Sequence, residues 1–306
     1  MLNVKRVKQI VAPSDLSIIE GKNINGPTCI KVPSWCKNKI AKYYLYFAHH
    51  SGKNIRMSYS DDLHGKWTNW KGGVLGLDGM NDAHHHLASP EIYINNNEQL
   101  IYLYFHAPSH SKNKEQWTFL ALSHDGIHFD KVIDRPLAPF YMRVFNYSGY
   151  IYGMVKGGDI WKSKDGISDF KSVVNPFDSS KLNNIWHDYI GAIRHVGLYR
   201  KKNILHVFFS RIGDKPERII HTSINLDKNL DKDWRIGNFS EVIKPDEDYE
   251  GANLIMKEST AGAAHYPENA LRDPYLMRDS NLFYLFYSVA GEQGIAFSQF
   301  KELPSI

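Results

Sequence analysis

Four carboxylates have neighbours that could adapt them to acid–base chemistry. Asp273 follows Arg272, whose guanidinium could hold the carboxylate for proton transfer, although the same pair could be a cap with an internal salt bridge. Asp188 follows a histidine that could share its charge, and Glu91 follows a proline. Glu250 lies in a long irregular segment, where glutamates are usually only solvated. We predict Asp273 and Glu250 as the first catalytic pair, with Glu91 and Asp188 in reserve.

A second group of residues has the side chains needed to bind a polar ligand. It consists of Arg143, Arg194, Arg211, Arg218, Arg272, His86, His106, His195 and Glu292. Guanidinium groups bind carboxylates and sulfates through two parallel hydrogen bonds, so this group suits an anionic or heavily hydroxylated ligand. For Arg211 and Arg218 a structural alternative stays open, because pairing with Asp214 and Glu217 would only stiffen their loop.

Three consecutive histidines, His84 to His86, invite comparison with a metal site. Consecutive residues cannot all face one ion, and the sequence has no second cluster with zinc-ligand spacing. A metal would need His49, His106 or His195 to converge from distant parts of the chain. We therefore expect a hydrogen-bonding loop and neither metal nor cofactor.

The elements that must position these side chains recur along the whole sequence. Each unit begins with an aromatic and apolar core, and the five cores start at Tyr43, Ile101, Tyr150, Ile204 and Leu282. A polar loop and a shorter strand-like run ending near a serine follow each core. Repetition of short β-rich runs at intervals of roughly 45–60 residues is typical of a β-propeller. The sequence predicts a single all-β domain over residues 1–306, a five-bladed propeller.

Turn and terminal sequences refine this prediction. Asp125-Gly126 and Asp165-Gly166 supply the positive φ that a tight turn between a third and a fourth strand requires. Aromatic residues Trp67, Phe129, Phe170 and Trp234 mark the fourth strands. The last unit lacks its fourth strand, and residues 4–13 have the pattern of that strand. We expect the N-terminal strand to complete the last blade and close the ring.

This topology places the loops after each second strand on the same face as the starts of the inner strands. The inner strands are expected to start near residues 25–27, 88–91, 141–143, 194–195 and 272–274. These segments and the loops beside them hold many of the histidines, arginines and carboxylates, whereas the opposite face carries mainly Asn, Lys, Ser and Gly. Residues 246–270 form a long insertion, and such insertions are usually functional. We predict a polar site at the propeller axis.

Bulk properties exclude several classes of protein. With 37 basic and 33 acidic residues, the net charge of +4 gives no basis for nucleic-acid binding. No run of 18 apolar residues could span a membrane, and the N-terminus lacks the apolar core of a secretory signal. Two cysteines do not make a disulfide framework. We expect a reduced, cytoplasmic protein, with an oligomeric state that the sequence does not reveal.

Several short motifs resemble those of five-bladed propeller glycosidases, the superfamily of glycoside hydrolase families 43 and 32. They are residues 271–276 (Leu-Arg-Asp-Pro-Tyr-Leu), residues 281–288, residues 89–93 (Ser-Pro-Glu-Ile-Tyr) and residues 250–252 (Glu-Gly-Ala). The resemblance implies carboxylates around an axial pocket, with Glu250 at the position of the general acid. The chain departs from the pattern where an aspartate is expected, because its first inner strand starts with Asn25 and its third contains Arg143.

These observations lead to a functional hypothesis. We expect a carbohydrate-active enzyme, foremost a glycoside hydrolase in which one carboxylic acid protonates the leaving oxygen and a second carboxylate activates water or attacks the sugar. The missing aspartates favour one alternative, a lyase or transferase that uses His, Tyr and Arg. A propeller that binds glycans without turning them over is the other.

Overall fold

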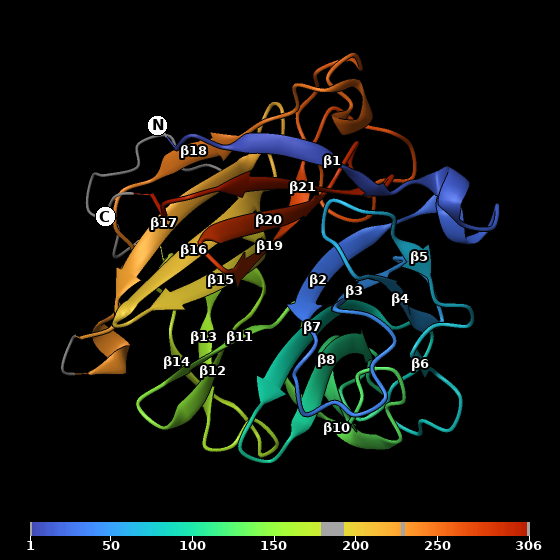
Figure 1. Ribbon diagram of the computed structural model, residues 1–306. Coiled ribbons are helices and arrows are strands. Elements are labelled where there is room, and N and C mark those ends of the chain that lie inside the picture. Colours follow the sequence, from blue (N-terminus) through green and yellow to red (C-terminus); the bar gives the residue numbers. More distant parts are fainter. Residues whose placement is uncertain (1, 179–192, 228–229, 305–306) are drawn as a thin grey trace.

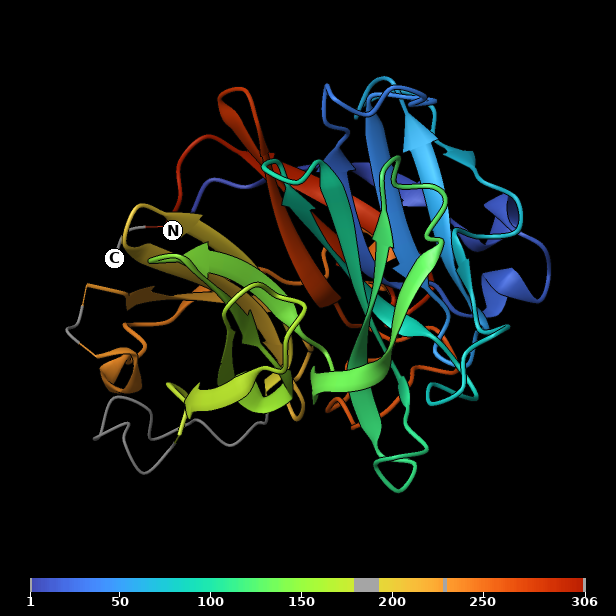
Figure 2. The same cartoon turned by 90° about the horizontal axis from the view of Figure 1, so that it is seen from below.

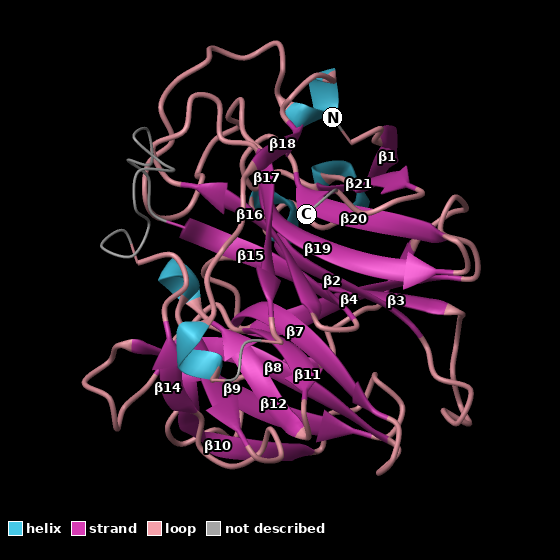
Figure 3. Cartoon of the chain, turned by 90° about the vertical axis from the view of Figure 1, so that its left-hand side faces the viewer, coloured by secondary structure: helices cyan, strands magenta, loops and turns pink. Residues whose placement is uncertain are grey.

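The computed structural model describes residues 2–178, 193–227 and 230–304. The described residues form five antiparallel sheets, and their helical segments are single turns (Figure 3). In this part of the chain no helix has the length and hydropathy needed to cross a bilayer. The fold is the five-bladed propeller that the repeat predicts.

Each blade is a sheet whose first strand lies innermost (Figures 1 and 2). Blade 1 contains β2 (Asn25–Lys31), β3 (Tyr43–Ala48), β4 (Asn54–Ser60), β5 (Thr68–Asn69) and the short β6 (Leu75–Gly76). Blade 2 contains β7 (Ala88–Asn95), β8 (Leu100–Pro108), β9 (Gln116–Ser123) and β10 (Lys131–Pro139). Blade 3 contains β11 (Arg143–Tyr147), β12 (Tyr150–Met154), β13 (Ile160–Ser163) and β14 (Lys171–Val174).

Blade 4 contains β15 (Ile193–Lys201), β16 (Ile204–Arg211), β17 (Ile219–Asn225) and β18 (Ser240–Ile243). Blade 5 contains β19 (Arg272–Asp279), β20 (Leu282–Ser288), β21 (Ile295–Phe300) and β1 (Lys5–Val11). The single turns are η1 (Pro13–Asp15), η2 (Glu20–Lys22), η3 (Lys156–Gly158), η5 (Asp231–Asp233) and η6 (Asp248–Glu250).

Contacts between neighbouring inner strands close the ring. Each of β2, β7, β11 and β15 contacts the next inner strand, and β19 contacts β2. β1 pairs antiparallel with β21, so the N-terminal strand completes the last blade as predicted (Figure 1). This closure leaves no unpaired inner edge, and it places the starts of all the inner strands at one end of the axis.

Apolar side chains fill the spaces between adjacent blades. Tyr46 of β3 donates a hydrogen bond to the carbonyl oxygen of Gly126 in the next blade (2.7 Å), and Tyr104 of β8 repeats this contact with Gly166 (2.9 Å). Both glycines have positive φ, as the Asp-Gly turns predict. Trp234 packs between blades 3 and 4, but the fourth strand of blade 4 begins later, at Ser240. The predicted aromatic packing is present, and the boundary of that strand was wrong.

Candidate functional site

The backbone is strained where the inner strands begin. Gly26, Ser89, Tyr141 and Asp273 have φ values of +63°, +47°, +60° and +53°. Three of these residues have side chains that disfavour positive φ, and such strain concentrates at functional sites. The strained positions belong to blades 1, 2, 3 and 5 and mark one end of the axis, which we call the axial mouth.

Irregular strand pairing occurs at the same level. The register between first and second strands shifts in four blades, between Asn25 and Thr28, Ala88 and Glu91, Ile193 and Val196, and Arg272 and Tyr275. A bulge of this kind turns a side chain away from the regular alternation of a strand. The axial mouth can therefore gather polar side chains that a regular sheet would have directed between the blades.

Asp273 and His195 form a buried pair at this mouth. One carboxylate oxygen of Asp273, Oδ2, accepts hydrogen bonds from the backbone N–H of Gly26 (3.1 Å) and from Oγ of Ser288 (2.8 Å). The other, Oδ1, contacts Nδ1 of His195. Nε2 of His195 is buried and has no hydrogen-bond partner among the described residues. With its proton on Nδ1, beside this carboxylate oxygen, His195 keeps the lone pair of Nε2 as a proton acceptor.

Aromatic rings surround His195. The Tyr141 ring stands edge-on to the imidazole, with centroids 3.8 Å apart and an interplanar angle of 89°. His106 contacts the same tyrosine at 4.7 Å, and His86 lies 5.9 Å from His106. Burial lowers the pKa of His195 and of His106 well below the ordinary range, and nearby cationic or histidine side chains act in the same direction. Both imidazoles are therefore neutral at pH 7.

A lysine lies over the aromatic part of the mouth. The ammonium of Lys156 is 5.1 Å from the centroid of Phe140 and 6.0 Å from that of Tyr141. Partial burial and the charge of Arg194 lower the pKa of Lys156. Burial, with a contribution from the carboxylate of Glu292, raises the pKa of Tyr141, so its phenol stays protonated. A protonated phenol thus contacts a neutral imidazole, and the ammonium lies over the phenol ring.

Two buried arginines share one glutamate on the blade 4 and blade 5 side of the mouth. Arg272 donates to Glu217 (2.9 Å), to Glu292 (3.4 Å) and to Glu268 (2.6 Å). Arg194 donates to the other oxygen of Glu217 (2.8 Å). It also donates to backbone carbonyls at positions 260 and 262 in the long insertion. Through these contacts, Arg194 and Arg272 anchor the long insertion to blades 4 and 5.

Arg143 and Glu91 occupy the axis and link the blades. The guanidinium of Arg143 donates to Oε2 of Glu91 (2.8 Å), to Oγ1 of Thr28 (2.6 Å) and to the carbonyl oxygen of Val196 (3.2 Å). Further bonds reach the carbonyl oxygens at positions 27 and 90, and its cation lies 5.4 Å from the ring of Tyr275. Arg143, itself in β11, therefore contacts residues of the other four inner strands. We call this buried group the axial plug.

Glu292 joins blades 1 and 5 at the rim. Its Oε2 accepts hydrogen bonds from the side-chain amides of Asn23 (2.5 Å) and Asn25 (3.2 Å), and Nδ1 of His50 lies 3.8 Å away. Its Oε1 faces Arg272. Asn25 stands where the resemblance expects an aspartate, and in this structure it binds a carboxylate instead of supplying one.

Glu250 is held away from Asp273. The carboxylate of Glu250 accepts hydrogen bonds from Nε of Arg6 (3.0 Å) and from the hydroxyl of Tyr287 (2.8 Å). Tyr287 packs in the core between blades 4 and 5, whereas Ser288, which binds Asp273, is the next residue of β20. Successive side chains of a strand point to opposite faces. The structure therefore does not bring the predicted pair Glu250 and Asp273 into one pocket.

The remaining candidates lie in different surroundings. Arg211 contacts Asp214 at 2.7 Å, and Arg218 lies 3.9 Å from the same aspartate, which matches the structural alternative for this loop. Glu217, the other acid of that alternative, instead binds Arg194 and Arg272. Asp188 lies outside the described residues.

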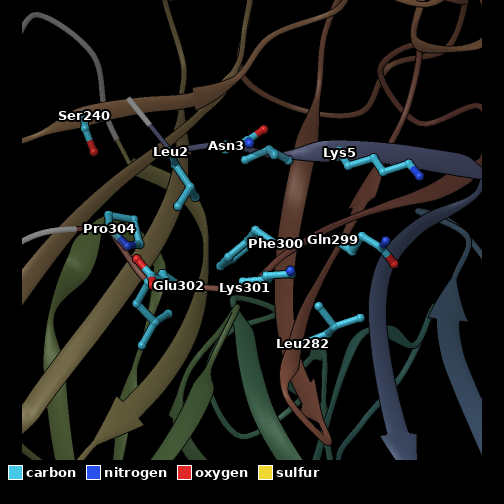
Figure 4. Close-up of a pocket in the computed structure, with 12 residues that line it drawn as sticks. Leu2, Asn3, Lys5, Ser240, Leu282, Gln299, Phe300, Lys301, Glu302 and Pro304 are labelled. Atoms are coloured by element: carbon cyan, nitrogen blue, oxygen red, sulfur yellow. The ribbon is translucent and has the colours of Figure 1, made fainter.

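The described residues contain no cluster of three His, Cys, Asp or Glu side chains close enough to hold a metal ion. A cavity of about 920 Å³ lies at the far end of blade 5 and is lined by both terminal segments, including Leu2, Leu282, Phe300 and Pro304 (Figure 4). Leu282 pairs with Asp279, at the opposite end of β19 from Asp273, so this cavity is separate from the axial mouth.

Sequence reasoning missed part of the mouth. Tyr141, Glu217 and Glu268 were not among the predicted site residues, although each lies in a segment that the topology places at this end of the axis. Positive φ at a tyrosine has no sequence signature, so the clue for Tyr141 was only its place before Arg143. Asp273 and His195 were both predicted, but not their pairing.

A protein of Acanthamoeba polyphaga mimivirus, uncharacterized protein R118, is 37% identical over 297 residues, which cover 90% of this chain and 82% of that protein. The chain belongs to the family of this viral protein. No family model matches the sequence.

Several solved structures have a fold similar to that of this chain. A thermostable family 43 glycoside hydrolase aligns with a TM-score of 0.61 at 15% identity, covering 90% of this chain and 88% of that one. The GH43_1 enzyme of Xanthomonas citri, complexed with xylotriose, gives 0.62 at 10% identity, covering 99% and 91%. CoXyl43, a β-xylosidase/α-arabinofuranosidase from a compost metagenome, gives 0.62 at 13%, covering 100% and 96%. These likenesses confirm the five-bladed propeller fold that the resemblance implied.

Proposed function

We propose that this protein is a carbohydrate-active enzyme that cleaves a glycosidic bond at its axial mouth. The observation that carries the proposal is the pair of Asp273 and His195, with Nε2 of the histidine left without a partner among the described residues. The likeness of the fold to glycoside hydrolases supports the class of substrate. Strained and bulged inner strands around the pair supply the rigid frame that such a site needs.

In the proposed mechanism His195 is the general base. Its neutral imidazole accepts a proton at Nε2, and the carboxylate of Asp273 stabilises the imidazolium that forms. Asp273 is then a positioning residue and not the proton donor of a carboxylate pair. In hydrolysis the base would activate the attacking water, as the second carboxylate does in paired-carboxylate enzymes.

The contacts of the predicted arginines change which residues we expect to bind the substrate. The five arginines that suggested an anionic ligand all contact acids of the protein itself. Lys156, His50 and His86 remain as partly exposed polar groups around the mouth. We propose that these three groups, together with the rim carboxylate Glu292, bind the sugar.

The test is an activity screen with matched variants. Wild-type protein is incubated with a panel of neutral and acidic oligosaccharides, and new reducing ends are quantified. We expect H195Q and D273N to lower kcat/KM by about 10²-fold or more, the range of general acid–base catalysis. D279N, at the opposite end of the same strand, and H128Q, on an exposed turn, should leave it unchanged.

Two outcomes would contradict the proposal. Full activity of H195Q on a cleaved substrate would remove the histidine base. Calorimetry that shows saturable binding of an oligosaccharide with no cleavage of any bond would instead favour the glycan-binding alternative.

A further inference from the structure

Among the described residues, the axial mouth contains a base but no carboxylic acid that is free to protonate a leaving group. Glu217, Glu268, Glu292 and Glu91 each lie within ion-pair distance of one or more arginines. Asp273 is held by a backbone N–H, a serine hydroxyl and His195. Each of these five carboxylates is thus already engaged by groups of the protein itself, so none is left free to meet a leaving group.

Tyr141 offers a different proton donor. Its phenol ring contacts the imidazole of His195 directly, with centroids 3.8 Å apart. Its strained backbone and its edge contact with His106 fix the ring over the axis. A phenol and an imidazole whose rings are in contact can form an acid–base couple that needs no carboxylic acid.

Lys156 adds the third component. Its ammonium lies over the rings of Phe140 and Tyr141, and no carboxylate among the described residues forms an ion pair with it. A cation beside an acid–base couple can bind a substrate carboxylate and stabilise the negative charge that develops when a neighbouring carbon loses its proton.

From this arrangement we infer that the substrate is a glycan containing 4-linked hexuronic acid, and that the glycosidic bond breaks by β-elimination. The inference rests on the proposed function. His195 Nε2 takes the proton from C5, and the C5–H electron pair becomes the C4=C5 double bond. The bond between C4 and the leaving oxygen breaks, and that oxygen takes the proton of the Tyr141 hydroxyl. Return of the proton from the imidazolium to the phenolate restores both side chains.

The contact between the two rings also selects the configuration of the sugar. Because His195 and Tyr141 touch, they approach the substrate from the same side, so the C5 hydrogen and the C4 oxygen must lie on one face of the sugar ring. This cis arrangement exists in a D-glucuronide. In a D-galacturonide, its epimer at C4, the two groups lie on opposite faces. The structure therefore favours a glucuronide.

The test uses the purified full chain with two epimeric substrates, a 4-linked glucuronide oligosaccharide and an oligogalacturonide. Ultraviolet absorbance of the conjugated 4,5-unsaturated product is recorded together with new reducing ends. We expect both signals to rise in parallel with the glucuronide and neither with the galacturonide. Y141F should lower kcat by about 10²-fold or more. K156M should raise KM and lower kcat, because the cation both binds the substrate carboxylate and stabilises the developing negative charge, and K156R should restore part of both.

Blade 3 provides matched controls at its far end. There Lys162 lies 4.0 Å from the ring centroid of Tyr150, a pair of the same chemical type as Lys156 and Tyr141. Y150F and K162M should leave both signals unchanged. D273N should shift the acidic limb of the pH–rate profile, because loss of the carboxylate makes the imidazole less basic.

The outcomes separate this inference from the proposed function. New reducing ends without ultraviolet absorbance would indicate hydrolysis, which overturns the inference and leaves the proposed function standing. Cleavage of neutral sugars but of neither uronide would also overturn the inference and leave the proposed function standing. Equal cleavage of both epimers, or an active Y141F, would overturn the acid–base geometry. A lack of binding and of cleavage with every glycan would overturn both proposals.

Discussion

Replacing Arg143 with methionine removes the cation of the axial plug and leaves Glu91 buried at the axis. Breaking a buried ion pair by removing one partner typically costs about 3–5 kcal/mol of stability, because an uncompensated charge remains. Both side chains are only 6% exposed, so water cannot replace the lost interaction. We therefore expect R143M to lower the free energy of unfolding by about 3–5 kcal/mol at neutral pH.

The loss should depend on pH. Burial raises the pKa of Glu91 above its ordinary value, and Arg143 opposes this rise. A carboxyl whose pKa is higher in the folded protein than in the unfolded chain destabilises the fold as pH rises through the interval between these two pKa values. Without Arg143 the pKa of Glu91 rises further, so the interval widens. We expect the stability of R143M to fall more steeply than that of the wild type between about pH 5 and pH 8.

Urea unfolding followed by tryptophan fluorescence measures this effect, since the chain has seven tryptophans. The matched control is R135M, which removes an exposed ion pair with Asp169 and should cost less than about 1 kcal/mol. E91Q/R143M should recover part of the loss, because the glutamine leaves no buried charge. Equal stabilities of R143M and R135M, or a loss independent of pH, would refute this account of the axial plug.

Three further predictions concern other parts of the fold. G126A should lower the melting temperature, because the added methyl group would lie 2.7 Å from a tyrosine hydroxyl at a φ of +77°. Protonation of the buried pair His206 and His221 should destabilise the protein in acid: burial lowers their pKa values to about 4 and about 3, so stability falls as pH drops below about 6.5. For His206 alone the loss approaches about 3 kcal/mol near pH 4. E250Q should reduce stability by about 1–3 kcal/mol while kcat/KM on any cleaved substrate stays unchanged.

Each of these predictions has its own check. G149A introduces the same backbone strain with open space around the new methyl group, so it should be milder than G126A in thermal unfolding. Replacing both His206 and His221 with phenylalanine should flatten the dependence of the unfolding free energy on pH between about pH 6 and pH 4, and an unchanged slope would contradict the assignment. A catalytic Glu250 would reveal itself as a large fall in kcat with normal stability.

The fold was predictable because each blade repeats the same local signals. Recurring aromatic and apolar runs marked the strands, Asp125-Gly126 marked a turn between them, and the pattern of residues 4–13 indicated ring closure. The axial end was predictable for the same reason, since topology alone decides which loops share a face. These conclusions need only the order of elements along the chain.

Which side chains pair with one another in the axial mouth could not be predicted in this way. Glu250 binds Arg6, which is 244 residues away along the chain, so a local motif that resembles a general acid turned out to lie in an ion pair. Glu217 could have paired with the arginines on either side of it, and it pairs instead with two from other strands. The sequence indicates which side chains gather at the axis, whereas their pairing depends on angles between blades and on bulges.

The pairing of β1 with β21 also constrains how the chain is made. β1 is synthesised before the other described strands, yet its only strand partner among them is β21, the last of them along the chain. Blades 1 to 4 each contain contiguous segments and can form during synthesis, whereas blade 5 must wait until β21 has been synthesised. The ion pair between Arg6 and Glu250 likewise forms only after most of the chain exists. A ribosome-bound chain that stops before residue 295 should therefore expose residues 5–11 to protease, and release of the full chain should protect them.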